Sequence, residues 1–259
     1  MFGWLSGLSF EGTRLFRKHG LNPQSFTAWE RAKLMPLLQA GTFDPVPEGC
    51  VIYDIGANVG RYATLFAKLS FCRTVVAWEP LPSAYAELTD KAKVHHSLLP
   101  QNVALGRESK SVRMFEDDYQ QASSLLLMED RHRKLFPMTG NQSVRQVDVR
   151  RLDHYVRENN LPSPYLVKLD VQGFEREVIL GGLDSIKAAR WCLLELSLLP
   201  LYKQAPLVSE MLELMEGLDF KLMEILRPLR GCDQSIISFD GLFRRVSATQ
   251  EREPAGMQS

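Results

Sequence analysis

Four acidic side chains stand where residues that take part in chemistry are expected. Asp54, Glu79, Asp170 and Glu195 each lie at or near the end of a short apolar run. A carboxylate accepts hydrogen bonds from hydroxyl groups, and beside an acceptor hydroxyl it can serve as a general base. These four residues are therefore the first candidates for ligand binding or catalysis.

A glycine-bearing turn, DIGANVG at residues 54–60, follows the first of these runs. Apolar residues then recur at helical spacing from Tyr62 to Leu69. Where a strand, a turn and a helix meet, glycines let the backbone approach a ligand, and the free N–H groups of the helix start point into the turn. The turn therefore predicts a site for a nucleotide-like ligand.

Glu79 narrows the choice of ligand. It follows Asp54 by 25 residues, close to the offset of about 20 residues at which an acid on the second strand binds ribose hydroxyls. The turn lacks the G-x-G-x-x-G spacing of dinucleotide sites, and no Gly-Lys-Ser/Thr follows it as in a phosphate-binding loop. A ribose-bearing ligand other than a dinucleotide is therefore favoured.

The candidate residues depend on strands that alternate with helices, a pattern that predicts a doubly wound α/β fold with a mostly parallel sheet. The last two predicted strands would form an antiparallel edge. Ligands of such folds lie beyond the carboxyl ends of the strands, so we expect the four acids to share a cleft. Strands are predicted at 51–53, 74–79, 98–105, 111–115, 143–149, 165–170, 190–196, 221–226 and 235–244.

The composition suggests three parts. Residues 1–47 predict a helical N-terminal extension or lid, and residues 48–246 predict the main domain. Within that domain, the polar residues 116–143 would form an insertion that covers the substrate. Residues 247–259 have too little apolar content to pack, which predicts a disordered tail.

Charge and cysteine content exclude several classes of protein. The 31 basic and 31 acidic residues cancel, which argues against a nucleic-acid partner. No apolar run approaches the roughly 20 residues of a transmembrane helix, and the first residues make a poor signal peptide. The four cysteines fit no metal-ligand spacing. We therefore expect reduced thiols in a cytoplasmic protein.

Several motifs resemble a known family. The segments DIGANVG at 54–60, WEP at 78–80 and NVALG at 102–106 resemble the S-adenosylmethionine-binding half of class I methyltransferases. VKLDVQGFE at 167–175 is similar to the K-x-D-V-[EQ]-G-x-E signature of the FkbM family, and FDGLFR at 239–244 resembles the last strand of that family. The resemblance covers about residues 48–245. It implies a Rossmann-like fold with a seven-stranded, mostly parallel sheet.

The resemblance also implies an activity and a cofactor. It indicates an O-methyltransferase that moves the sulfonium methyl of S-adenosyl-L-methionine to a hydroxyl of a sugar, glycolipid or other natural product. The implied cofactor-binding residues match positions of this chain. Gly56 and Gly60 would lie near the methionine part, Asp54 and Asn58 would shape that loop, Glu79 would bind the ribose, and Asn102 and Ala104 would lie near the adenine or the substrate.

Asp170 is the first candidate for a general base, because it ends the strand expected nearest the acceptor. It could instead anchor the turn or bind the methionine ammonium group. Glu175 is the second candidate, although an acid also suits the start of a helix. Lys168 lies on the same strand face as Asp170 and would pair with Glu175 or a neighbouring acid. Asp170 and Glu195 could hold a divalent cation, but without a further clear carboxylate we expect no metal site.

Two other functions stay open from the sequence. An NAD-dependent oxidoreductase is disfavoured by the glycine spacing. A non-catalytic module could retain the cofactor and bind partners, or form a homo-oligomer, through residues 1–45. A small-molecule or glycan acceptor is expected, but its identity is not readable from these residues, and an amine acceptor is not excluded.

Overall fold

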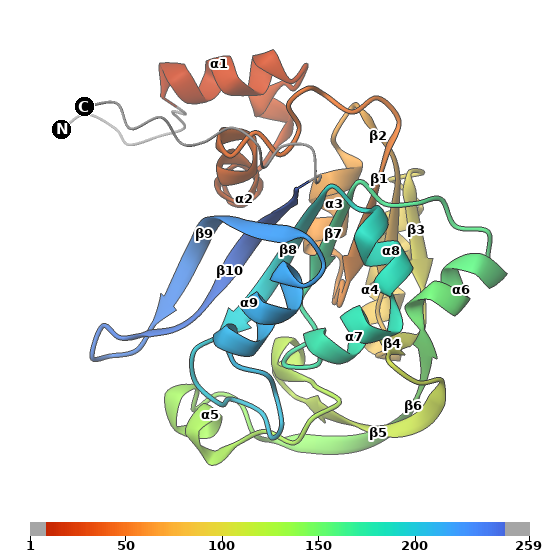
Figure 1. Cartoon of the computed structure of the whole chain (residues 1–259), viewed down its shortest axis with the longest axis vertical. Coiled ribbons are helices and arrows are strands. Elements are labelled where there is room, and N and C mark those ends of the chain that lie inside the picture. The colour runs from red at the N-terminus through yellow and green to blue at the C-terminus, as the bar shows by residue number, and fades with distance from the viewer. Residues whose placement is uncertain (1–8, 247–259) are drawn as a thin grey trace. The chain divides into compact units, whose positions relative to one another are not determined.

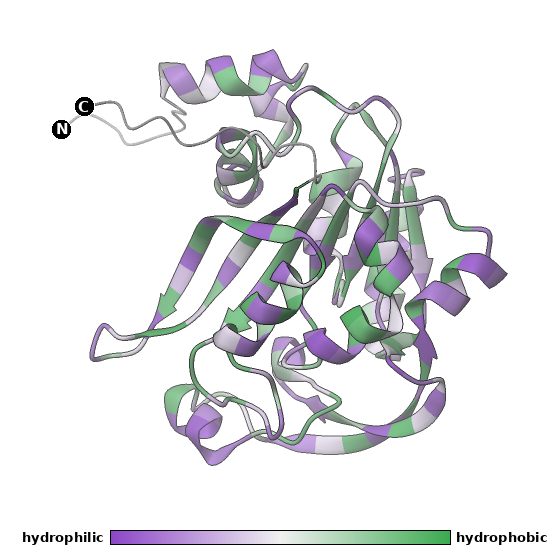
Figure 2. Cartoon of the chain, viewed as in Figure 1, coloured by the Kyte–Doolittle hydropathy of each residue, from purple (hydrophilic) through white to green (hydrophobic). Residues whose placement is uncertain are grey.

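The computed structural model describes residues 9–246 (Figure 1). The chain divides into two compact units, residues 1–104 and 105–259. Strands of the main sheet are mostly hydrophobic, whereas helix α6 (Leu152–Glu158) is mostly hydrophilic (Figure 2). Within the described residues, no helix is long and apolar enough to cross a membrane.

The first unit begins with helices α1 (Phe10–Lys18) and α2 (Ala28–Gln39), joined through a short 3-10 turn, η1 (Pro23–Ser25). Thr27 and Glu30 form a capping box at the start of α2, which satisfies two backbone N–H groups that the helix leaves unpaired. The same Glu30 carboxylate lies 2.7 Å from Lys68 Nζ. Glu30 therefore caps α2 and also forms an ion pair with the residue that follows α3.

Three parallel strands form the sheet of the first unit, in the order β3-β2-β1. The residues of β1 are all buried, as expected for a strand covered on both faces. Helices α3 and α4 connect the strands and put their carboxyl ends on one edge. The bounds are β1 (Cys50–Ile55), α3 (Arg61–Ala67), β2 (Cys72–Trp78), α4 (Pro82–Ala92) and β3 (Leu98–Gln101).

Four strands of the main sheet belong to the second unit, in the order β7-β8-β10-β9. β7 and β8 are parallel, whereas β10 is antiparallel to both β8 and β9. The bounds are β7 (Leu166–Leu169), α7 (Glu175–Gly181), α8 (Leu183–Ala188), β8 (Trp191–Ser197), α9 (Val208–Glu216), β9 (Phe220–Arg230) and β10 (Ile236–Arg245). The prediction of a mostly parallel seven-stranded sheet with an antiparallel C-terminal edge is confirmed.

A second, three-stranded sheet was not predicted from the sequence. The run 98–105 is two strands, β3 and β4 (Ala104–Gly106), and β4 belongs to this smaller sheet. β5 (Lys110–Asp117) and β6 (Gln142–Arg151) pair as antiparallel neighbours. Between them lie the 3-10 turn η2 (Gln120–Ala122) and helix α5 (Asp130–Leu135), both within the predicted insertion. The predicted disordered tail, 247–259, lies outside the described residues, and the role of residues 1–47 as a lid stays a prediction.

Candidate functional site

The turn after β1 has an unusual backbone, and this explains its residue types. Gly56 and Gly60 both have φ of 77°, and Asn58 has φ of 48°. These values lie in the left-handed region that glycine and, less readily, asparagine adopt. The N–H groups of Gly56 and Ala57 both donate to the Trp78 carbonyl oxygen, at 3.1 and 2.9 Å. The turn is thus fixed to the end of β2.

Gly60 has a second constraint, which comes from packing. A Cβ atom at this position would lie 2.5 Å from Leu88 Cδ1 of α4. Leu88 is fully buried, so it has little room to move aside. The structure therefore gives Gly60 a packing role at the junction of α3 and α4, in addition to the predicted ligand approach.

Glu79 holds this turn in place. Its side chain is 4% exposed. Its Oε2 accepts a hydrogen bond from the Asn58 N–H and its Oε1 accepts one from the Leu81 N–H, both at 2.8 Å. A carboxylate has about four acceptor positions, so Glu79 is able to bind several groups at once. The sequence did not predict that Glu79, the residue expected to bind ribose, would also accept backbone hydrogen bonds that hold the glycine turn.

The other predicted cofactor residues of the first unit also have structural contacts. Asn102 Nδ2 donates to the carbonyl oxygens of Glu79 and Pro80, at 2.9 and 3.1 Å, and so orders the chain after β2. Asp54 is fully buried at the end of β1, and Ala104 is buried in β4. The structure therefore brings Asn58, Glu79 and Asn102 into one hydrogen-bonded group.

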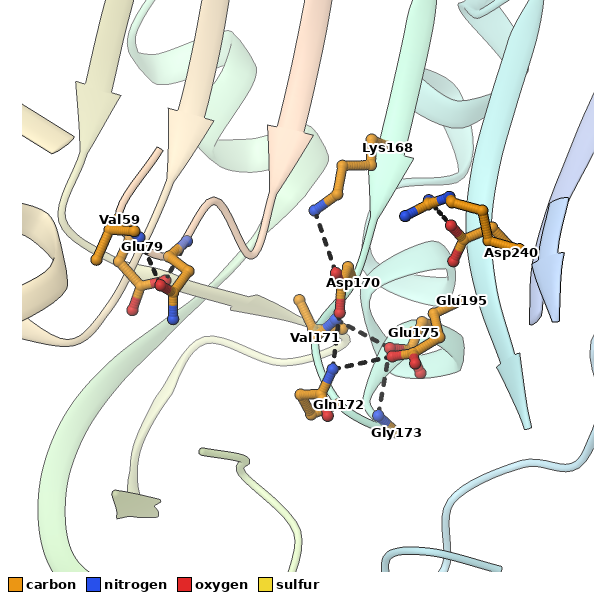
Figure 3. A network of polar contacts seen from close by, with 12 residues as sticks. Val59, Glu79, Lys168, Asp170, Val171, Gln172, Gly173, Glu175, Glu195 and Asp240 are labelled. Carbon is orange, nitrogen blue, oxygen red and sulfur yellow. Dashed lines mark hydrogen bonds and ion pairs between the residues drawn. The ribbon is translucent and has the colours of Figure 1, made fainter. Parts of the chain in front are cut away.

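Acids of the second unit gather just after β7 and near the end of β8. Leu169 and Leu194 are register partners in these parallel strands, so the next residues along, Asp170 and Glu195, stand side by side. Gln172 Nε2 donates to Asp170 Oδ1 at 2.8 Å and to Glu195 Oε2 at 2.9 Å (Figure 3). The expected proximity of strand-end acids therefore holds for this pair.

Asp170 is the accessible member of the group. Its side chain is 38% exposed, and its Oδ2 lies 3.6 Å from the Nζ atom of the buried Lys168. Lys168 therefore pairs with Asp170, one of the neighbouring acids that the sequence left open as its partner. A carboxylate that contacts a buried cation on one side and solvent on the other is accessible to a ligand.

Glu175 is buried instead. Its Oε1 accepts hydrogen bonds from the Val171 N–H at 2.9 Å and the Gly173 N–H at 3.2 Å, which closes the turn after β7. Burial raises the pKa of Glu175 to about 7, and the charge of Asp170 adds to this effect, while the backbone hydrogen bonds act against it. The contacts of Glu175 are those of a residue that orders the turn.

Glu195 was identified as a strand-end acid but not as a site residue. Burial raises its pKa well above the usual value, and the charges of Asp170 and Glu175 and a hydrogen bond with Asp170 act in the same direction. Its register partner across the antiparallel pair is Asp240, which forms an ion pair with Arg227. Three carboxylates thus follow one another on β7, β8 and β10.

Two further residues of the site were missed from the sequence. Gln172 was quoted only as part of a motif, and Tyr202 was not singled out, because a lone tyrosine after a strand carries no signal. The Tyr202 hydroxyl donates to Gln172 Oε1 at 3.0 Å. The insertion contributes too, since Ser124 Oγ donates to the Gln172 carbonyl oxygen at 2.7 Å. Within residues 9–246, no three His, Cys, Asp or Glu side chains are grouped so that they could hold a metal ion.

Comparison with solved structures gives distant similarities. A methyltransferase FkbM from Methylobacillus flagellatus KT aligns with 90% of this chain and 57% of its own, at 12% identity and a TM-score of 0.47. Fibrillarin from Aeropyrum pernix aligns with 83% of this chain and 75% of its own, at 11% identity and a TM-score of 0.46.

Curated relatives are methyltransferases. Methyltransferase 1 of Beauveria bassiana is 30% identical over 54% of this chain, and the match spans 61% of that relative's length. Hexuronic acid methyltransferase AglP of Haloferax volcanii is 24% identical over 67% of this chain and 70% of its own. 2-O-methyltransferase NoeI of Sinorhizobium fredii is 28% identical over 61% of this chain and 68% of its own.

A family model describes more than half of the chain, and it contains most of the residues discussed above. The model of the methyltransferase FkbM domain matches residues 54–222. This range begins at the acid that opens the glycine turn, and it contains both Glu79 and the turn after β7. The chain therefore belongs to the FkbM methyltransferase family.

Proposed function

We propose that the protein is an S-adenosyl-L-methionine-dependent O-methyltransferase whose acceptor is a hydroxyl of a sugar, glycolipid or other natural product. The observation that carries this proposal is Asp170, an accessible carboxylate beside a buried lysine in the family signature. The names of two relatives, a hexuronic acid methyltransferase and a 2-O-methyltransferase, support a sugar or another hydroxyl compound as the acceptor. The family match gives no support to an NAD-dependent oxidoreductase.

The first unit would hold the methyl donor. The cofactor offers a ribose diol, an adenine, a carboxylate and an ammonium group. Glu79 suits the diol, because a carboxylate accepts hydrogen bonds from hydroxyl groups and lies here beside the glycine turn. Gly56 and Gly60 would admit the methionine part, with Asp54 and Asn58 shaping the loop. Asn102 and Ala104 would border the adenine or the substrate.

When bound, the cofactor supplies a methyl group made electrophilic by its sulfonium. The acceptor oxygen would bond to this carbon as the carbon–sulfur bond breaks, and the electron pair of the broken bond would stay on sulfur. An alcohol is a weak nucleophile while it keeps its proton, so a base that takes the proton assists the step. Asp170 would accept this proton and release it to solvent. Lys168 would hold the Asp170 carboxylate in place.

The charge of the second unit bears on the acceptor class. Asp170, Glu195 and Asp240 occupy adjacent positions on three neighbouring strands. Carboxylates accept hydrogen bonds from hydroxyl groups. Lys168 pairs with Asp170 and Arg227 with Asp240, which balances part of this charge. We therefore infer that this group would bind hydroxyl groups of the acceptor, in neutral sugars and in uronic acids alike.

The donor proposal is tested by titration calorimetry with S-adenosylhomocysteine. We expect micromolar affinity, and no binding at high micromolar concentration would overturn the proposal. Acceptor classes are then screened with methyl-labelled cofactor, with neutral sugars, uronic acids, lipids and amines in parallel. A protein that binds the cofactor but methylates none of them would favour the non-catalytic module.

Two predictions about the cellular context accompany this function. All four cysteines are free thiols, which suits the predicted cytoplasmic location. Homo-oligomer formation through residues 1–45 also stays a prediction, and sedimentation analysis of the full chain tests it.

A further inference from the structure

The carboxamide of Gln172 contacts both of the acids that stand at the ends of β7 and β8. Its Nε2 atom donates to Asp170 at 2.8 Å and to Glu195 at 2.9 Å (Figure 3). An amide nitrogen has two hydrogen atoms, so each carboxyl group receives one of them. Gln172 therefore uses its full donor capacity to join two acids that would otherwise repel each other.

The oxygen of this carboxamide faces Tyr202. The Tyr202 hydroxyl lies 3.0 Å from Gln172 Oε1, and it also lies 3.1 Å from the Ala122 carbonyl oxygen and 3.4 Å from His132 Nε2. His132 is itself held by its Nδ1 atom, 3.1 Å from Thr139 Oγ1. A rotated carboxamide would turn its oxygen toward the two acids and lose both bonds, so the acids fix its orientation. Tyr202 and the insertion between β5 and β6 support the oxygen side.

The backbone of Gln172 is also held in a constrained conformation. Its φ is 53°, which is uncommon for a residue other than glycine and costs free energy that the surroundings must supply. Ser124 Oγ donates to the Gln172 carbonyl oxygen at 2.7 Å, and Glu175 binds the N–H groups on either side. The contacts on both sides fix the position from which the side chain reaches Asp170 and Glu195.

We propose that Gln172 is a positioning residue for methyl transfer, and that its carboxamide, supported by Tyr202, holds Asp170 and Glu195 as one pair. This inference rests on the proposed function. As the acceptor oxygen bonds to the methyl carbon, its proton passes to the pair and then leaves to solvent through the exposed Asp170. Glu195 acts on the reaction only through Asp170.

Several charged groups face this pair, and each affects its proton affinity. Lys168 and Arg227 favour ionisation, and the remaining acids oppose it. The surrounding groups are Lys168 on β7, Glu175 on α7, Tyr202 after β8, Asp240 on β10 with its partner Arg227 on β9, and Asp117 on β5 near Tyr202.

The first test is the isosteric variant Gln172→Glu. It replaces the nitrogen that donates to both acids by an oxygen, and it adds a negative charge. We expect kcat at neutral pH to fall about tenfold or more, because the base is misplaced. The added charge raises the pKa of the pair, so the acidic limb of the kcat profile moves to higher pH, by about one unit. Affinity for S-adenosylhomocysteine should stay within about twofold of the wild type.

Tyr202→Phe separates positioning from folding. It keeps the buried ring and removes only the hydroxyl that contacts Gln172, so we expect a smaller loss of kcat and a shift of the acidic limb in the same direction. The matched control is Tyr155→Phe. Tyr155 is a half-buried residue of helix α6, outside the insertion and outside the proposed site. This control should change neither kcat nor the pH profile.

A second readout does not depend on activity. The carboxyl carbons of Asp170 and Glu195 are followed by 13C NMR across pH, in the wild type and in Gln172→Glu. We expect coupled titration in the wild type, and titration displaced to higher pH in the variant. Unchanged titration and an unchanged kcat profile in a folded variant would overturn the inference. A displaced titration in a protein that methylates no acceptor would overturn the proposed function and leave the pairing intact.

Discussion

The turn after β1 and the turn after β7 are both closed by a buried glutamate, and the two glutamates lie in different electrostatic surroundings. Glu79 and Glu175 are each 4% exposed, and each accepts two backbone N–H groups of its turn. Asp170 and Glu195 crowd Glu175, and burial with the charge of Asp170 raises its pKa to about 7. A buried glutamate thus closes the glycine turn in one unit and lies within a group of acids in the other.

The comparison predicts that methyl transfer depends on the turn after β7. It predicts that binding of the methyl donor depends on the turn after β1. Asp170→Asn removes the proposed base and keeps the shape of the side chain. We expect kcat to fall by roughly 10²–10⁴-fold, the usual contribution of general base catalysis. Affinity for S-adenosylhomocysteine should be unchanged in calorimetry.

Asp90→Asn is the matched control for this variant. Asp90 is an exposed carboxylate that pairs with Lys93 at 2.7 Å, and its replacement should leave kcat unaffected. Methyl transfer that survives Asp170→Asn would remove Asp170 as the base. A large loss of cofactor affinity would instead identify it as a ligand of the methionine ammonium group.

The raised pKa of Glu175, in the turn after β7, predicts that the free energy of unfolding depends on pH. The pKa of Glu175 is raised from 4.5 to about 7, so the folded state binds a proton that the unfolded state has released. This contribution is fully present below pH 4.5 and is lost as pH rises to about 7. A shift of this size corresponds to about 3 kcal/mol in the free energy of unfolding.

Glu175→Gln should abolish this contribution, because the amide oxygen can still accept the two N–H bonds and no charge forms. Urea unfolding at pH 5 and pH 8 measures the difference between variant and wild type. The control is Glu177→Gln, which replaces a half-buried acid in the same turn of α7. Equal pH slopes for the Glu175 variant and the wild type would contradict the assignment.

Glu79→Ala tests the first turn. It removes the acceptor of two backbone N–H groups and the proposed ligand of the ribose. We expect the affinity for S-adenosylhomocysteine to weaken by roughly 1.5–3 kcal/mol, the size of a lost hydrogen bond to a charged group. Glu79→Gln should weaken it less, since one acceptor oxygen stays. An unchanged affinity would move the ribose site elsewhere.

The fold was largely predictable from the sequence, because alternating strand and helix patterns report burial directly. The run 98–105 was predicted as one strand, since residue patterns do not reveal that β3 and β4 belong to different sheets. Strand-end acids were also predictable. The hydrogen bonds that Gln172 and Tyr202 form were not, because they join segments that only the folded chain brings together. The roles of Glu79 and Glu175 in closing their turns depend in the same way on backbone conformation.

Gly60 shows how the first turn can be tested apart from any ligand. Gly60→Ala meets two obstacles, a φ of 77° and the approach of Leu88 Cδ1 to 2.5 Å from the new Cβ. Gly49 is the matched control, since its φ is 63° and no atom lies within 4 Å of an added Cβ. Both substitutions therefore place alanine at a positive φ, with a similar cost in conformational free energy. Only Gly60→Ala also overpacks the core. We expect the Gly60 variant to lose about 1–2 kcal/mol more in urea unfolding than Gly49→Ala. Equal losses would mean that α4 yields to the methyl group, and the glycine would then be required for backbone conformation alone.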